Sequence, residues 1–497
     1  MPLRGIHSEE EILLYFDMLE SRDDFSQLKK ALQGPLLDPL KQFRLGRKEI
    51  VLRAIRVLSK ANEWAIVYAL IKDCLTEKDE QGRPSLLASD WSIWKSLVEA
   101  ATHLVSTNPE YASPCFFSDS ANSPNSIFQE VPDLIESHLS VEKLPIYTRT
   151  LLLARILASF ELGDAGKPGT TLKPAESARV SQIVSFAENQ YGNPSCFQDI
   201  KRFVELLGTA EQRHLAYDIL PRITDESRGY KWLAFQVLTC KIRYFILTTP
   251  QGRLLATSGQ EEETSVMDEA QIGAECLRLY RTLEAAESGD MRRAQADFLP
   301  DLAVLAATCL LKTAGVGRDP AGFAPQSADL RIVLQATLIL EHQLEKTPKN
   351  SGINLLLSRL YLNLGCARRA MATFDAVEVK RTIVESHSPL FIDRLSGAAP
   401  DLASGPFLAS SVQSHYFNSL RLRMPRKLAD AFDASAYTSI LQIPRHTDSL
   451  RTSCTMVMGY MEEMRAQRMM RVRRGDNLAA STIGKIASSK PEFVNSG

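Results

Sequence analysis

The fold class is set by residues 46–75, which read GRKEIVLRAIRVLSKANEWAIVYALIKDCL. Within 46–60 the apolar residues recur at spacings of one and three, which places them on one helical face: Ile50, Val51, Ala54, Ile55 and Leu58. A second apolar-faced segment follows at 62–75 after a very short break, and Asn62 at the joint is a suitable cap residue. This stretch therefore predicts two successive helices joined by a tight turn.

The same helical pattern recurs along most of the chain. No run of alternating strands occurs, and no Asn-Gly or Asp-Gly hairpin signal lies between apolar runs. We therefore predict an all-α fold, with further helices at about 8–20, 25–33, 91–105, 146–162, 174–190, 196–207, 228–248, 266–286, 292–312, 327–346, 351–364, 367–377 and 447–472.

Paired helices with short turns are typical of a helical-repeat solenoid. The best repeat follows Pro348, where seven residues fall at the offsets of a tetratricopeptide repeat: Leu357, Ser358, Tyr361, Gly365, Ala370, Phe374 and Val377. Small Ser358 and Ala370 let two helices approach closely, and Tyr361 and Phe374 fill the groove between them. The prediction is an all-α, superhelical solenoid of degenerate tetratricopeptide-like helical repeats.

Composition shifts divide the chain into regions. We expect a helical-repeat solenoid over 1–395, with exposed loops rich in Gly, Pro, Ser and Thr near 163–173, 250–265 and 313–327. A linker is expected at 396–412, followed by a C-terminal helical region at 413–474. The polar tail at 475–497 lacks a sustained apolar face, so we expect it to be disordered.

Composition limits the partners and the compartment. The 497 residues are 44% apolar and 24% charged, with a formal net charge of −1, so a folded chain without a DNA partner is predicted. The start of the chain has no apolar signal segment, and the longest apolar run, Leu302–Leu311, is far shorter than the roughly 20 residues of a membrane span. We expect no membrane partner and a cytoplasmic location.

The cysteines are scattered singly along the chain. No CxxC pair occurs, so a zinc ribbon or finger is not predicted, and a disulfide scaffold is unsuited to so long a chain. We expect reduced, mostly buried thiols at Cys74, Cys115, Cys196, Cys240, Cys276, Cys309, Cys366 and Cys454.

Candidate catalytic patterns lack the context that their chemistry requires. The pattern of an acetyl-CoA phosphate loop occurs at 394–399 (RLSGAA), and a near match at 312–317, but neither leads from a strand into a helix. Asp23 and Asp24 lack the third carboxylate of a DDxxD magnesium site and suit a helix cap better. No two histidines have metal-ligand spacing on one helical face. The sequence predicts no catalytic residue, no metal ligand and no cofactor.

Two local basic clusters contrast with the neutral total charge. The first basic cluster comprises Arg421, Arg423, Arg426 and Lys427, and the second comprises Arg465, Arg468, Arg471, Arg473 and Arg474. Either could contact a phosphate backbone such as ribosomal RNA. The alternative is a solvated face with cations at a helix C-terminus. The methionines between residues 456 and 470 are expected to fill a core rather than to bind a peptide.

The stretch from Tyr191 reads YGNPSCFQDIKRFVELL and contains Pro194, Cys196, Phe197, Asp199, Ile200 and Lys201. These residues resemble a phrase that is characteristic of the auxiliary, non-catalytic subunit of the NatB amino-terminal acetyltransferase complex. Similar segments lie at 8–32, 90–101 and 335–382, and the last of these ends in an Asp-x-x-Val-Lys phrase at Asp375–Lys380. The resemblance covers roughly residues 8–395, with a weaker echo at 428–470.

This resemblance implies a scaffold without its own cofactor. Auxiliary subunits of this family wrap a helical-repeat superhelix around a catalytic GNAT-fold subunit, which holds acetyl-CoA, and dock the complex at the ribosome. The complex acetylates nascent chains that begin Met-Asp, Met-Glu, Met-Asn or Met-Gln. Family members carry several repeats before the equivalent of residue 8, so we expect a chain truncated at its N-terminus. Loss of those repeats would expose an apolar face in helix 8–20, formed by Ile12, Leu13, Tyr15, Phe16 and Leu19.

Two other classes of protein stay open at this point. A helical-repeat interaction adaptor unconnected with acetylation would account for the single good repeat. An all-α enzyme would require a metal or carboxylate cluster that only folding assembles.

Overall fold

The computed structural model describes residues 8–474 with internal gaps. The gaps lie at 21, 23–24, 33, 35–36, 78–84, 108–126, 141–144, 163–176, 224–228, 250–267, 287–288, 315–328, 380–382 and 406–411. Every regular element in the described residues is helical, which confirms the all-α helical-repeat class. The expected loops at 163–173 and 250–265, nearly all of the loop at 313–327, the tail at 475–497 and the Asp23–Asp24 pair lie outside the described residues.

The chain divides into two compact units, Met1–Phe298 and Leu299–Gly497. The sequence-based division placed a boundary at residue 395, so the two divisions differ. One helix, α15 (Gly289–Thr313), begins in the first unit and ends in the second.

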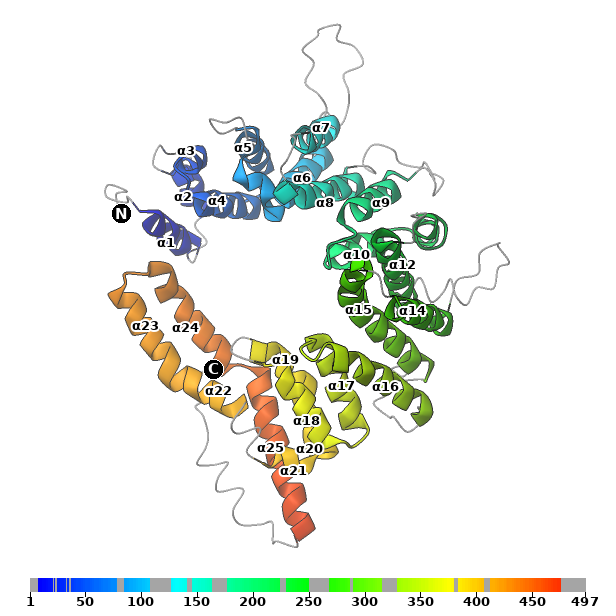
Figure 1. Cartoon of the computed structure of the whole chain (residues 1–497). Coiled ribbons are helices and arrows are strands. Elements are labelled where there is room, and N and C mark those ends of the chain that lie inside the picture. The colour runs from blue at the N-terminus through cyan, green and yellow to red at the C-terminus, as the bar shows by residue number, and fades with distance from the viewer. Residues whose placement is uncertain are drawn as a thin grey trace. The chain divides into compact units, whose positions relative to one another are not determined.

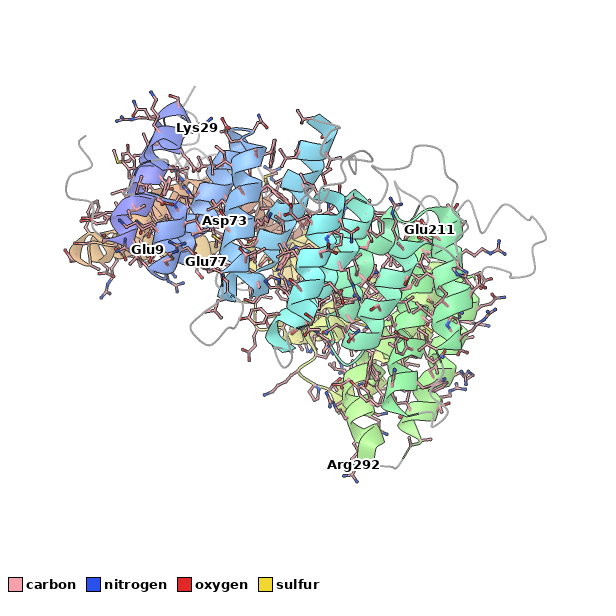
Figure 2. The ribbon with its side chains drawn as sticks, turned by 90° about the horizontal axis from the view of Figure 1, so that it is seen from above. Glu9, Lys29, Asp73, Glu77, Glu211 and Arg292 are labelled. Atoms are coloured by element: carbon pink, nitrogen blue, oxygen red, sulfur yellow. The ribbon has the colours of Figure 1, made fainter. Side chains whose placement is uncertain are left out.

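The first unit is a series of helices in chain order (Figures 1 and 2). Most pack against helices one or two places along the chain, as in a repeat array. Its elements are α1 (Glu9–Glu20), α2 (Phe25–Leu32), α3 (Pro39–Arg44), α4 (Lys48–Lys60), α5 (Trp64–Thr76), η1 (Leu86–Ser89), α6 (Trp91–Thr107), α7 (Ile127–Leu139), α8 (Pro145–Glu161), α9 (Ala178–Gln190), α10 (Cys196–Leu206), α11 (Thr209–Arg213), η4 (His214–Ile219), η5 (Leu220–Arg222), α12 (Tyr230–Thr248) and α14 (Glu269–Glu284).

Helices α4 and α5 confirm the opening prediction. All five apolar residues of the predicted face of α4 are buried. Asn62 adopts a left-handed conformation (φ 58°) just after α4, which Asn tolerates better than most residues. The next amide, of Glu63, donates to the carbonyl of Leu58 at 3.0 Å, so the chain reverses within a few residues.

The prediction that the apolar face of the first helix is exposed is wrong. Ile12, Phe16 and Leu19 of α1 are at most 5% exposed, because α1 packs against α2 and α4. Leu13 and Tyr15 are partly buried against the same core. The apolar face of α1 is therefore covered within its own unit.

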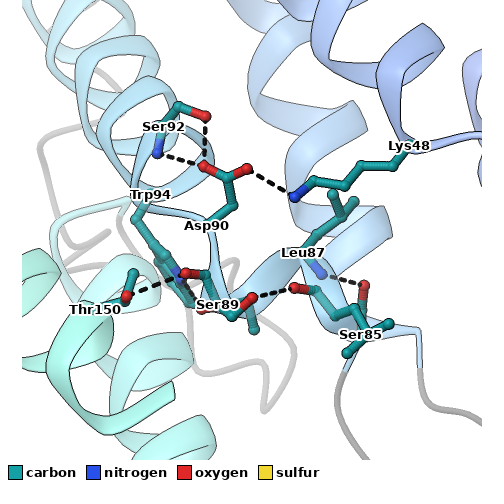
Figure 3. A network of polar contacts seen from close by, with 10 residues as sticks. Lys48, Ser85, Leu87, Ser89, Asp90, Ser92, Trp94 and Thr150 are labelled. Atoms are coloured by element: carbon teal, nitrogen blue, oxygen red, sulfur yellow. Dashed lines mark hydrogen bonds and ion pairs between the residues drawn. The ribbon is translucent and has the colours of Figure 1, made fainter. Parts of the chain in front are cut away.

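A polar junction fixes α4, α6 and α8 around the short helix η1 (Figure 3). The Asp90 carboxylate accepts from the Ser92 amide at 2.9 Å and pairs with Lys48 at 2.9 Å. Burial opposes the charge of this carboxylate, but hydrogen bonds from Ser92 and Lys48 outweigh it, so the pKa of Asp90 lies below its ordinary value. Beside it, the buried indole of Trp94 donates to the carbonyl of Ala88 at 2.8 Å.

The phrase at 191–207 forms a second junction, between α8, α10 and α12. The Asp199 carboxylate of α10 accepts hydrogen bonds from Nε and Nη2 of Arg149 of α8, at 2.8 and 2.6 Å. The Phe197 ring meets the Phe245 ring of α12 edge-on, and the Lys201 ammonium lies 5.0 Å from the Phe245 centroid. These residues therefore hold helices together, which is a structural role.

The second unit contains the remaining helices. They are α16 (Leu330–Lys346), α17 (Ser351–Asn363), α18 (Ala367–Ala376), α19 (Ile383–Ile392), α20 (Leu395–Ala398), α21 (Pro400–Ala403), α22 (Ser414–Asn418), the π-helix η8 (Ser419–Arg423), α23 (Met424–Asp433), α24 (Tyr437–Arg451) and α25 (Cys454–Arg474). The predicted helix at 447–472 is broken at Thr452–Ser453, where α24 ends and α25 begins.

The prediction of a linker at 396–412 is wrong for the first half of this range. Helices α20 and α21 occupy 395–403 and pack against α25, and Leu395, Ala399 and Ala403 are buried. Small residues allow this close packing, although the same Gly, Ala and Ser content is also typical of linkers. Residues 406–411 lie outside the described part of the chain.

The thiols largely follow the prediction. Cys74, Cys196, Cys240, Cys276 and Cys309 are free and buried, whereas Cys366 and Cys454 are free and exposed. Cys115 lies outside the described residues.

Candidate interaction surfaces

The pattern that resembles a phosphate loop is occupied by a side chain of the protein itself. The Ser396 amide, at the start of α20, donates to the buried carboxylate of Glu462 at 2.8 Å. Arg394 precedes it in the left-handed region (φ 57°). An amide that a phosphate would need is therefore already bonded to an internal anion, and α20 is a single short turn.

Several of the described histidines make packing or hydrogen-bonding contacts. The His103 ring stacks on Trp64 with centroids 4.1 Å apart, and the His138 ring contacts the carbonyl oxygens of Leu134 and Leu75 at 2.8 and 3.1 Å. Across the described ranges, no three His, Cys, Asp or Glu side chains converge in a way that could hold a metal ion.

The predicted repeat corresponds to the closely packed pair α17 and α18. Leu357, Ser358, Tyr361, Ala370 and Phe374 are all buried between helices. Helix α17 ends in a turn that requires glycine, because Gly365 has φ 75°. The Gly365 amide donates to the carbonyl of Leu362, and the Cys366 amide donates to the carbonyl of Tyr361 at 2.7 Å. The pair packs as expected, and its assignment as a tetratricopeptide repeat stays a prediction.

Aromatic contacts extend this pair to its neighbours. The Tyr361 hydroxyl donates to Glu341 of α16, and burial together with this carboxylate raises the pKa of Tyr361. The Phe374 ring stacks on Phe391 of α19, with centroids 4.5 Å apart. These residues are structural rather than accessible to a ligand.

The first basic cluster lies on the helical segment α22–η8–α23. Arg421, Arg423, Arg426 and Lys427 are all exposed, and none forms an ion pair with a described carboxylate. The Arg421 guanidinium lies 4.9 Å from the centroid of the exposed Phe417 ring. The π-helical turn at η8 widens the backbone where two of these cations project, a feature often found at functional sites.

His415 lies beside this cluster. Its ring meets Tyr416 edge-on at 5.3 Å between centroids. Burial lowers the pKa of His415, and the positive charges of Arg423 and His446 add to this effect, whereas Glu385 opposes it. Arg423 is therefore the member of the first basic cluster whose charge contributes to the lowered pKa of His415.

Helix α25 is fixed at its N-terminus by Glu385 of α19. The Ser453 hydroxyl donates to the Glu385 carboxylate at 2.8 Å and accepts from the Met456 amide at 3.1 Å, so it also caps the helix. The buried Tyr416 hydroxyl donates to the same carboxylate. Burial and this carboxylate raise the pKa of Tyr416 to about 12.

The second basic cluster differs from the first in its partners. Arg465 pairs at 2.9 Å with Glu462, the same buried carboxylate that accepts from Ser396. Arg468 is exposed. Arg471, Arg473 and Arg474 belong to the last turns of α25, but their side chains lie outside the described residues. The basic run at the end of α25 is therefore partly engaged within the fold.

The expected burial of the methionines is correct for only part of the set. Met456 is buried and Met458 is partly buried, whereas Met461 and Met469 are 48% and 47% exposed. Val457 and Tyr460 are also half exposed. The spacing 457, 460, 461 and 464 could have shown in the sequence that these residues share one helical face. Glu385 and Glu462 gave no such signal, because most of their partners are more than 30 residues away.

Within the part of the chain that the structure describes, one helix has the length and apolarity needed to cross a membrane. It is Arg292–Thr313 within α15, and half of its apolar window is buried inside the structure. A core helix of a folded protein satisfies the same test.

The helices pack in chain order, and many polar side chains form hydrogen bonds at the junctions between them. This arrangement defines the chain as a helical-repeat protein that presents charged and apolar surfaces. Residues 91–494 match the family model of the N-acetyltransferase B complex (NatB) non catalytic subunit. The chain therefore belongs to this family of non-catalytic subunits.

A curated relative is the N-terminal acetyltransferase B complex subunit MDM20 of Saccharomyces cerevisiae. The two are 26% identical over 149 residues, which are 30% of this chain and 19% of the yeast protein. The matched segment thus spans less than a fifth of that relative.

Proposed function

We propose that this chain is the scaffold subunit of a NatB complex and binds a catalytic GNAT-fold subunit. The observation that carries this proposal is the family match over residues 91–494. The architecture agrees with it, since repeat arrays offer long surfaces for a protein partner. Acetyl-CoA would belong to the catalytic partner, because the phosphate-loop pattern at 394–399 is closed by Glu462.

The complex would act on nascent chains that begin Met-Asp, Met-Glu, Met-Asn or Met-Gln, at cytoplasmic ribosomes. We propose no membrane or DNA partner. The scaffold would contribute by holding the catalytic subunit near the emerging N-terminus, which raises the effective concentration of the substrate.

The first basic cluster is the proposed contact with ribosomal RNA. Its four cations are exposed and unpaired with described carboxylates, so they are available for phosphates. Phe417 and Leu422 add exposed apolar surface beside them, and an aromatic ring can stack on an unpaired base. In the second cluster, Arg468 is the described cation that is available in the same way.

Affinity purification of the full chain from its own cells tests the scaffold role. We expect a GNAT-fold protein to co-purify and the complex to acetylate Met-Asp and Met-Glu peptides, whereas a Met-Lys peptide serves as the control substrate. Recovery of other partners without acetyltransferase activity would instead favour a helical-repeat adaptor unconnected with acetylation.

A further inference from the structure

Helix α25 has two faces of different character. Met456, Glu462 and Ala466 are at most 7% exposed and point into the second unit. The opposite face carries three half-exposed apolar side chains, each 47–48% exposed: Val457, Tyr460 and Met461. The helix thus presents an apolar stripe to its surroundings although one full face is already packed.

The exposed charged side chains of α25 beside this stripe are cations. Arg468 has no ion pair with a described carboxylate, whereas the exposed Arg465 also pairs with Glu462. The two carboxylates of α25 in this region are both bonded inside the unit. Glu462 binds Ser396 and Arg465, and Glu463 accepts hydrogen bonds from Gln413 and Gln467. The exposed side chains of this face are therefore apolar or basic.

The helix is also held in place before any partner arrives. The Ser453 hydroxyl donates to the Glu385 carboxylate, and the Thr455 hydroxyl donates to the Glu385 carbonyl at 2.9 Å. Glu462 connects the middle of the helix to α20. A surface fixed in this way loses little conformational entropy on binding. Methionine side chains on a rigid helix can still adapt to the shape of a partner.

We propose that the outward face of α25 docks an amphipathic helix of the catalytic subunit that carries apolar side chains flanked by carboxylates. This inference rests on the proposed scaffold function. The exposed arginines favour a partner helix with carboxylates along its edge. The half-exposed Val457 and Met461 favour apolar side chains at the centre of that helix, since a phosphate backbone would leave both residues in water.

Helix α16 provides a matched comparison within the same unit. Leu330, Leu334 and Leu338 are 45–62% exposed at a spacing of four residues, so α16 also presents an apolar stripe. Its exposed border is mixed, with Arg331 and Glu345. Substitutions on α16 therefore reproduce the chemistry of those on α25 without the exposed basic border.

The test uses the full chain and the catalytic subunit recovered by the affinity purification. Surface plasmon resonance measures the Kd between the two. We expect Met461→Glu to weaken binding by about tenfold or more, as for a central apolar contact, and Leu334→Glu to change it by less than about twofold. Arg468→Glu should slow association relative to Arg331→Glu, and the difference should shrink at high salt.

The outcomes separate the two proposals. If the wild-type chain binds the catalytic subunit and Met461→Glu binds equally well, the α25 proposal is overturned and the scaffold function stands. If the wild-type chain does not bind, both are overturned. Loss of self-association or of RNA binding in Met461→Glu, with catalytic-subunit affinity unchanged, also overturns it. Circular dichroism and the melting temperature of each variant exclude misfolding as the cause.

Discussion

The two basic clusters of the second unit are both rich in arginine, but their surroundings differ. Arg423 and Arg426 stand on an exposed helical segment without a described anionic partner, whereas Arg465 pairs with a carboxylate whose side chain is 3% exposed. The difference arises from Glu462, three residues before Arg465, which folding buries against Ser396. A run of arginines in a sequence therefore does not reveal how many cations are free to bind.

The largest expected effect is on the engaged side of this comparison. Glu462→Ala leaves the buried Ser396 amide without an acceptor and Arg465 without its partner, so we expect the free energy of unfolding to fall by about 2–3 kcal/mol. Arg426→Ala, in the exposed cluster, should change it by less than about 0.5 kcal/mol. Urea denaturation of both variants measures the difference. Equal values would show that the two clusters do not differ in structural role.

A smaller loss is expected at the start of α25. Ser453→Ala removes the cap of the helix and a donor to Glu385, which should cost about 1–2 kcal/mol. The neighbouring Thr452→Ala is the control, because this exposed hydroxyl bonds only carbonyls of its own helix. Thermal unfolding followed by circular dichroism compares them. A control as unstable as Ser453→Ala would place the effect in local helix propensity.

The exposed cluster should affect RNA binding rather than stability. Replacing Arg421, Arg423 and Arg426 by Gln should weaken binding to ribosomes by about tenfold and reduce the slope of log K against log salt by about 2–3. Arg465→Gln serves as the single-site control and should reduce the slope by less than about one. Co-sedimentation with ribosomes over a range of salt concentrations measures both. An unchanged slope in the triple variant would exclude the first basic cluster as the RNA contact.

The smallest effect concerns the titration of His415. Because the folded protein holds the pKa of His415 below its ordinary value of 6.5, the unfolded chain binds the proton more readily, and stability present above pH 6.5 is lost as the pH falls below it. Arg423→Gln should raise the pKa of His415, and Arg465→Gln should leave it unchanged. Histidine-selective NMR titration follows both. A shift of the same size in the two variants would separate His415 from the first cluster.

Local sequence patterns predicted several elements well. The apolar spacing at 50–58, the helix break at Asn62 and the glycine turn at Gly365 each act within one helix or one turn, so neighbouring residues suffice to specify them. Prediction was less successful for residues 396–403, where small residues suited both a linker and close helix packing. The exposed Met461 and Met469 show the same ambiguity, because an apolar side chain signals contact without naming the partner.

By itself, the sequence determined the helical class, the repeat-like pairing at 351–376 and the resemblance to the NatB auxiliary family, because these properties depend on residues a few positions apart or on similarity over long segments. Only the tertiary structure decided which face of α25 is free, that Glu462 closes the phosphate-loop pattern, and that α2 and α4 cover the apolar face of α1. Each of these depends on contacts between helices separated along the chain. Hydrophobic periodicity specifies a face of a helix, but only packing specifies what that face meets.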